Sequence, residues 1–223
     1  MENLPVPHLA SADNSLQRRA VELSLEELDR QQVQQALQRW AQGQQLAALQ
    51  SLDTFVFQYP HAHQSREALA KLLLQQGERE RAGQVADIGL NVAPAHPAYK
   101  KIKARLLFDQ GYVADALQVL DSLIPAVHQD PEYHDLRATA QLADRQYSAA
   151  LTSYQALLQQ DANVGRWWYG MATALEALDR GPEAVTAYER ATQQGDLSMM
   201  LRQRSQQRVQ ELSSQSANEA GSR

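Results

Sequence analysis

The sequence predicts an all-α protein: a right-handed superhelical solenoid of about five helix-turn-helix repeats, closed by a C-terminal capping helix. Three observations predict this architecture. Alanines recur at one fixed spacing along most of the chain. Good helix formers such as Ala, Leu, Gln and Glu dominate, and only ten glycines and eight prolines interrupt the 223 residues. Residues that favour helix starts stand where the repeats require them.

Two sets of alanines define the repeat. The first set is evenly spaced and comprises Ala48, Ala82, Ala116, Ala150 and Ala184. The second set lies twelve positions earlier and comprises Ala36, Ala70, Ala104, Ala138 and Ala172. Small residues at two fixed positions let the two helices of a repeat pack closely, and a period of about 34 residues without insertions is typical of the tetratricopeptide repeat (TPR). We expect repeats at 29–62, 63–96, 97–130, 131–164 and 165–198.

Capping signals support the expected helix starts. Ser24 and Glu27 form a capping box that opens the first helix slightly before the first repeat. Asp130 precedes Pro131, so an N-cap stands before a proline at the first helical position. Pro97 and Pro182 mark helix starts in the same way. Between the two helices of a repeat, the turn carries a glycine in three repeats: Gly43, Gly77 and Gly111.

The ends of the solenoid are expected at residues 24 and 213. Asp196 is expected to cap a last helix over 197–213, whose polar run 202–208 suits a terminal helix with one face in water. Residues 1–23 and 214–223 are expected to be disordered because they are polar and lack the period.

Composition excludes several classes of protein. The 26 acidic and 21 basic residues give a net charge of −5, which argues against a nucleic-acid partner. The absence of cysteine excludes disulfides and thiolate chemistry. No apolar stretch approaches the roughly 20 residues that a membrane span needs, so direct membrane insertion is not expected. The first residues show no basic and apolar signal-peptide pattern.

The first helix of each repeat is expected to line a concave groove. By register, Lys71, Lys101 and Arg105 form a small basic patch there, with Phe108 beside it. Such a patch would bind a carboxylate or an acidic peptide segment. The alternative is that these are ordinary solvated charges paired with nearby acids such as Glu67, Asp109 and Asp135.

The tetrapeptide at residues 166–169 is the most unusual in the chain. Trp168 falls where TPRs bury a large residue, so we expect it in the core. Trp167 and Tyr169 are candidates to face the groove or a partner, although Trp167 would equally cover the edge of the neighbouring repeat. The candidate partner-binding residues are Lys71, Lys101, Arg105, Phe108, Arg166, Trp167 and Tyr169.

Catalytic and metal-binding patterns are not found. The sequence has no nucleophile elbow, no zinc-protease helix motif and no phosphate-binding loop. The pair His61 and His63 resembles half of a metal site but has no helix-spaced third ligand. We therefore predict no catalytic residue, no cofactor and no metal, and expect that the protein is not an enzyme.

The last two repeats carry a more specific resemblance. The run Gly165–Leu178, together with Asp130–Tyr133 and Gln207–Val209, resembles the TPR region of the MshN family of MSHA-type pilus biogenesis proteins of Gram-negative bacteria. The resemblance covers about residues 29–210. It implies an accessory factor of type IV pilus assembly that acts through protein–protein contacts at the periplasmic face of the inner membrane. The family carries an N-terminal membrane helix, and this sequence shows none.

We therefore expect a non-enzymatic scaffold for protein–protein interaction in pilus or cell-envelope assembly, which binds a partner segment in its concave groove. One alternative is a cytoplasmic TPR adaptor for a regulator or enzyme, which the missing signal and membrane helix favour. The other is a self-associating module, in which the amphipathic ends at 24–50 and 197–213 pair between copies to form a homo-oligomer.

Overall fold

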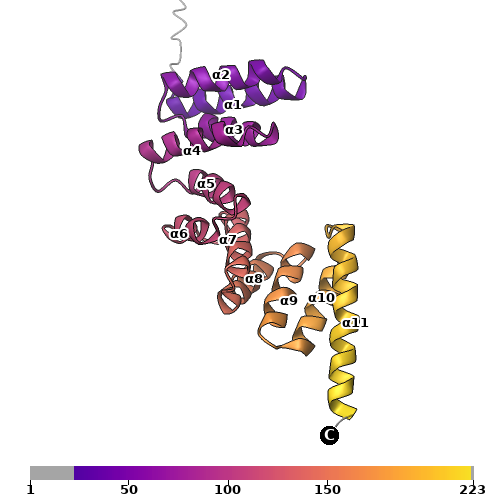
Figure 1. Cartoon of the computed structure of the whole chain (residues 1–223). Helices are drawn as coiled ribbons and strands as arrows, with labels where there is room; N and C mark the ends of the chain where they lie inside the picture. The colour runs from indigo at the N-terminus through magenta and orange to yellow at the C-terminus, as the bar shows by residue number, and fades with distance from the viewer. Residues whose placement is uncertain (1–22, 222–223) are drawn as a thin grey trace, which may run out of the picture.

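The computed structural model describes residues 23–221, with side chains to residue 215. In this part of the chain eleven α-helices and no strand are found, which confirms the predicted all-α class. In order they are α1 (Leu25–Ala41), α2 (Gln45–Gln58), α3 (His63–Gln75), α4 (Arg79–Val92), α5 (Pro97–Asp109), α6 (Val113–Asp121), α7 (Pro131–Ala143), α8 (Tyr147–Gln160), α9 (Gly165–Ala177), α10 (Gly181–Gln193) and α11 (Met199–Gly221). Figure 1 shows them as five successive helical hairpins followed by α11.

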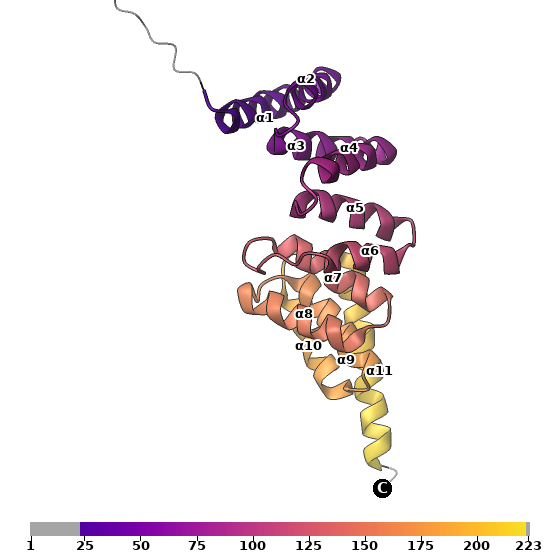
Figure 2. The same cartoon turned by 90° about the vertical axis from the view of Figure 1, so that its left-hand side faces the viewer.

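The hairpins stack in chain order, and each packs mainly on the next (Figures 1 and 2). The odd-numbered helices α1 to α9 also contact one another in sequence, and α11 packs along α10. The buried side chains accordingly form successive clusters, around Leu52, Tyr99, Tyr133 and Trp167. The core therefore follows the stack of repeats, as in other repeat proteins.

The turn inside each hairpin uses the same left-handed backbone position. Gly43 and Gly77 have φ of +80° and Gly111 has φ of +86°. The next two turns place Arg145 (φ 60°) and Asp179 (φ 58°) at the same register of the repeat. Glycine adopts this conformation without the steric cost that a Cβ brings. The five turns share one geometry even where the glycine is missing.

Most of the expected caps are present. The Ser24 capping box opens α1, and the Asp130 carboxylate accepts from the backbone N–H of Tyr133 at 3.0 Å. The expectation for Asp196 was wrong. Its carboxylate accepts from the N–H of Gly165 at 2.8 Å and so caps α9, not α11. The loop before α11 lies against the start of α9, where the first amides have no partner within the helix.

The fourth residue of several repeats fastens the preceding loop. Its side-chain N–H donates to a backbone carbonyl in the loop that follows the preceding helix. The pairs are Arg66 with Pro60, His134 with Pro125 and Trp168 with Ala162, at 2.7–2.8 Å. One residue position thus joins consecutive repeats through different side chains.

Helices α6 and α11 differ in length from the other helices of the chain. Helix α6 has nine residues, against fourteen in α4 and α8. Pro125 follows shortly after its end and cannot donate a helical hydrogen bond. Helix α11 was expected to end at residue 213, before a disordered tail at 214–223. It runs to Gly221, and no proline interrupts this segment. The expected disorder of residues 1–22 and 222–223 lies outside the described residues.

Candidate partner-binding groove

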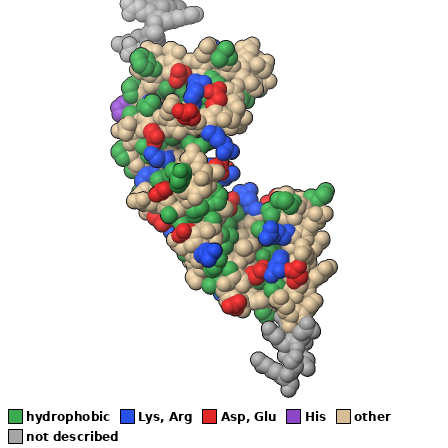
Figure 3. All heavy atoms as spheres, viewed as in Figure 1, with side chains coloured by type: hydrophobic (Ala, Val, Ile, Leu, Met, Phe, Trp, Pro, Cys, Tyr) green, Lys and Arg blue, Asp and Glu red, His purple; other side chains and the backbone are tan. Residues whose placement is uncertain are grey.

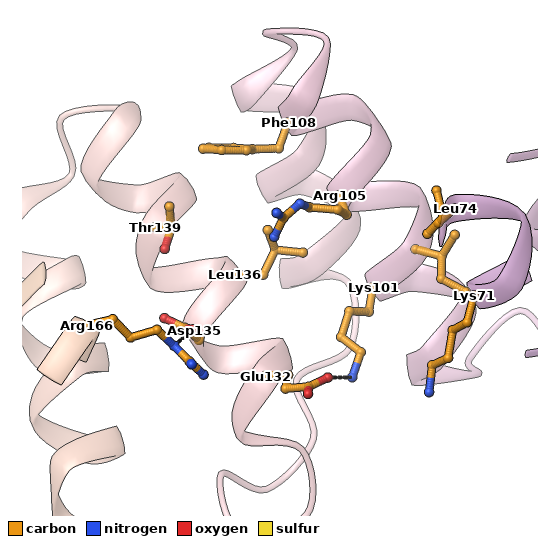
Figure 4. A pocket seen from close by; sticks show the side chains of 11 residues that line it. Lys71, Leu74, Lys101, Arg105, Phe108, Glu132, Asp135, Leu136, Thr139 and Arg166 are labelled. Carbon is orange, nitrogen blue, oxygen red and sulfur yellow. Dashed lines mark hydrogen bonds and ion pairs between the residues drawn. The ribbon is translucent and has the colours of Figure 1, made fainter. Parts of the chain in front are cut away.

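A groove of about 510 Å³ runs along the first helices of four consecutive repeats, α3, α5, α7 and α9 (Figure 4). Its lining residues are Lys71, Leu74, Lys101, Ile102, Arg105, Phe108, Glu132, Asp135, Leu136, Thr139 and Arg166. Five of the seven residues that the sequence singled out lie here. In the space-filling view, the molecule is hollowed between its N-terminal hairpins and α11, and Lys and Arg side chains stand at the edge of the hollow (Figure 3).

The floor of the groove is apolar. Ile102 and Leu136 are buried, while Leu74 and Phe108 are half-buried and keep part of their surface open to the groove. Figure 4 shows the Phe108 ring extending from α5 above Leu136 of α7. When a partner covers apolar surface that is in contact with water, the free energy of binding becomes more favourable by about 25 cal/mol per Å². The floor therefore offers apolar surface that a partner's side chain can cover.

Lys101 is the most constrained cation of the groove. Its Nζ donates to both carboxylate oxygens of Asp130, at 2.8 and 2.9 Å, and to Glu132 at 3.2 Å. Burial of the ammonium acts to lower the pKa of Lys101, but the hydrogen bonds and charges of Asp130 and Glu132 outweigh it and raise the pKa. Because Asp130 also caps α7, Lys101 connects α5 to the start of α7.

The other three cations are exposed and weakly held. Each forms one ion pair: Lys71 with Glu67 at 2.5 Å, Arg105 with Asp109 at 3.2 Å and Arg166 with Asp135 at 2.7 Å. Their side chains are 53–61% exposed, and pairs of this kind contribute about 0–1 kcal/mol. The pairing expected as the alternative is thus what the structure shows without a partner. A partner's carboxylate can therefore replace these ion pairs at little cost in free energy.

Trp167 and Tyr169 lie outside the groove. Trp167 is only 4% exposed and belongs to the C-terminal core cluster, so its expected contact with a partner was wrong. Tyr169 is half-buried, with its ring edge-on to Tyr188 at 5.7 Å between centroids. Trp168 was expected in the core but is only partly buried, because its indole N–H reaches out to the carbonyl of Ala162.

The third position of the repeat explains the burial of Trp167. It is buried in four consecutive repeats, where it holds Ser65, Tyr99, Tyr133 and Trp167. These residues follow the same interval as the alanines, and the last three are large aromatic residues. The burial of Trp167 was therefore predictable from the sequence. The aromatic pattern stands at the third position of the repeat, next to the fourth position that was expected in the core.

A metal-ligand cluster and a membrane-spanning helix are both absent from the described residues. They contain no group of three His, Asp or Glu side chains placed to hold a metal ion. None of their helices is long and apolar enough to cross a membrane. The charged and apolar side chains of the groove offer binding surface, and no nucleophile with an activating base stands among them.

Comparison with known proteins agrees with this architecture. The family profile described as tetratricopeptide repeat matches residues 33–90 and 136–198, together more than half of the chain. No curated protein sequence matches significantly.

Solved structures similar to the chain share its fold. MamA (residues 41 to the end) from Desulfovibrio magneticus is 20% identical with a TM-score of 0.62, and the match covers 77% of this chain and 95% of that one. PilF of Pseudomonas aeruginosa is 16% identical with a TM-score of 0.63, covering 86% and 91%. YrrB, described as a TPR protein with an unusual peptide-binding site, is 15% identical with a TM-score of 0.63, covering 79% and 90%. Period, hairpin geometry and family profile agree, and the chain belongs to the tetratricopeptide repeat family.

Proposed function

We propose that the protein is a non-enzymatic scaffold that binds a segment of a protein partner in the groove along α3, α5, α7 and α9. The observation that carries the proposal is the convergence of exposed cations on an apolar floor. Lys71, Arg105 and Arg166 come from three different helices and line the same groove as the half-buried Phe108. TPR proteins generally act through protein–protein contacts, and the similar structure of YrrB is described as having a peptide-binding site.

The chemistry of the groove describes the partner segment. One large apolar side chain would cover Phe108 and Leu74, and carboxylates on either side would take over the exposed cations. Glu132 is 75% exposed at one edge and would repel an acid placed directly above Lys101. The favoured partner is therefore an acidic segment with a central apolar residue.

The biological setting that we propose is accessory work in type IV pilus or cell-envelope assembly. Its support is the resemblance of residues 165–178 and their flanking motifs to MSHA-type pilus biogenesis proteins, which implies partners at the periplasmic face of the inner membrane. The likeness to PilF is one of fold at 16% identity and adds nothing on partners. A cytoplasmic adaptor is the second setting, and fractionation of cells with detection of the native protein separates the two.

A photo-crosslinking amino acid in place of Phe108 tests the groove directly. Phe57, on α2 and 90% exposed, is the matched control position. We expect acidic segments with a large apolar residue to crosslink at 108 and not at 57, with the crosslinked peptides identified by mass spectrometry. Equal crosslinking at the two positions would remove the groove proposal.

Charge reversal gives a second test. In the variant Arg105→Glu/Arg166→Glu, affinity for the crosslinked segment should fall at least about tenfold, because two attractive contacts become repulsive. The control Arg81→Glu/Arg180→Glu makes the same change in charge away from the groove and should bind like the wild type. Lys101 is left unchanged because reversing it beside Asp130 would disturb the start of α7.

A further inference from the structure

A cluster of imidazole and phenol rings joins the second and third repeats. His63 is the first residue of α3, and His96 is the residue before α5. Their ring centroids lie 5.0 Å apart, and His96 stacks on Tyr99 at 4.4 Å. The Nδ1 of His63 lies 2.9 Å from the hydroxyl of Tyr99, which is fully buried. Two loops that are distant in sequence therefore meet through three rings.

Protonation is unfavourable at both histidines. Each stands at the N-terminal end of a helix, where the helix dipole repels a positive charge. The Nδ1 of His96 is buried without a hydrogen-bond partner among the described residues. A protonated imidazole must donate from both nitrogens, so a proton on His96 would leave one buried N–H without an acceptor.

The surrounding charges do not compensate. His61 and Arg66 face His63 as further basic groups. The two nearby acids are already occupied: the Asp29 carboxylate accepts from the N–H groups of Gln64 and Ser65 at 2.9 and 2.8 Å, and Glu67 binds Lys71.

The pKa values follow these surroundings. Burial, together with the charges of His96, His61 and Arg66, lowers the pKa of His63 below its ordinary value, against the opposing effect of Asp29. Burial also lowers the pKa of His96, although the nearby Glu67 acts in the opposite direction. Burial raises the pKa of Tyr99 to about 12, so the phenol does not titrate near neutral pH and keeps its contact with Nδ1 of His63.

We propose that His63 and His96 form a proton-sensitive joint, which holds the second and third repeats together while both imidazoles are neutral and loosens when they are protonated. Lys71 and Leu74 on α3 face Lys101 and Phe108 on α5 across this joint, so its loosening would change the shape of the groove. That last consequence rests on the proposed function of the groove, whereas the joint itself does not.

The sign of the effect follows from linkage. A histidine with a lowered pKa in the folded state binds fewer protons than in the unfolded chain. Its contribution to stability is therefore fully present above the ordinary pKa of about 6.5, and is lost as the pH falls below it and through the lowered pKa.

Histidine NMR titration of the wild-type protein tests the joint without any variant. We expect both His63 and His96 to titrate below the ordinary histidine pKa of about 6.5. Titration of both at that ordinary value, or above it, would overturn the proposal.

Unfolding measurements test the energetic side. Stability is measured at about pH 7.5 and about pH 5.5, on either side of the ordinary histidine pKa. The variant His63→Gln/His96→Gln should lose less stability on acidification than the wild type, and the control His128→Gln should lose as much. If the double variant fails to fold, His96→Gln alone serves. Equal losses in all proteins would contradict the joint.

Distance measurement tests the motion. The chain has no cysteine, so spin labels can be attached at Gln75→Cys on α3 and Gln155→Cys on α8, both exposed and on opposite sides of the joint. We expect the distance distribution to widen at the lower pH, and to stay unchanged when His63 and His96 are also replaced by Gln. An unchanged wild-type distribution would refute the loosening. No partner is involved, so failure of the groove proposal would leave this result interpretable.

Discussion

At the scale of single residues, backbone conformation is repeated more strictly than residue type. Five turn positions, one in each repeat, adopt a left-handed φ, but only the first three are glycine. The left-handed conformation costs an L-residue about 1–2 kcal/mol relative to glycine, partly offset by the greater chain entropy of glycine in the unfolded state. Arg145 and Asp179 thus carry strain that Gly111 does not.

Replacing Arg145 by Gly should therefore stabilise the protein by about 0.5–1 kcal/mol. Arg145 is exposed, and the rest of its turn has the geometry of the glycine turns. The converse change, Gly111→Ala, should destabilise by a similar amount although its Cβ would meet no atom within 4 Å. Urea unfolding of the two variants measures both signs. A destabilised Arg145→Gly would show that the arginine side chain contributes more than its exposure suggests.

Residue burial could be predicted only in part. The alanines of the period are buried because two helices meet at them, and the sequence pattern predicts this directly. Trp167 and Trp168 are neighbours with opposite outcomes, because the first helix of a repeat packs on two sides and buries more than one stripe. Adjacent tryptophans cannot be assigned by periodicity within one helix; comparison with Tyr99 and Tyr133 at the same repeat position assigns them.

At the scale of helices, starts were more predictable than ends. Capping boxes and prolines are local signals, and α1, α5 and α7 begin where these signals stand. The end of α6 comes shortly before Pro125, whereas α11 passes the end expected at residue 213, where no proline stands. The groove was predictable because register alone places residues of successive first helices side by side, whereas their ion pairing depends on side-chain geometry.

Two arginines attach helix α11 besides its apolar face. Arg202 donates to the carbonyls of Thr192 and Gln194 at the end of α10, and Arg208 forms an ion pair with α9. The guanidinium of Arg208 binds the carboxylate of Glu176 on α9, with Nε 3.1 Å from Oε2, and the Tyr188 hydroxyl donates to the same oxygen at 2.9 Å. Arg208→Ala should therefore speed amide hydrogen exchange in α11 several-fold, since both side chains are only 28% exposed. Arg204→Ala, on the exposed side of the same helix, is the control. Equal exchange in the two variants would mean that the ion pair of Arg208 with Glu176 does not hold α11 in place.

At the scale of the whole molecule, successive clusters in place of one central core predict local unfolding. Leu52 and Leu157 are both fully buried, but they belong to clusters at opposite ends of the stack. Replacing a buried leucine by alanine costs about 2–5 kcal/mol. In a stack where each repeat contacts its neighbours, the loss of local stability should be largest in the repeats beside the cavity and should decrease with distance along the chain.

Leu52→Ala should therefore raise hydrogen exchange in α1 to α4 and leave α9 and α10 near wild-type rates, while Leu157→Ala should do the reverse. Each variant is the control for the other, because the side chain, the substitution and the burial are matched. Uniform acceleration along the chain in both variants would show one cooperative unit. The repeats would then act as a rigid body, and a change at the joint of His63 and His96 would reach the groove only through global unfolding. Local exchange would instead allow the two halves of the groove to move while both remain folded.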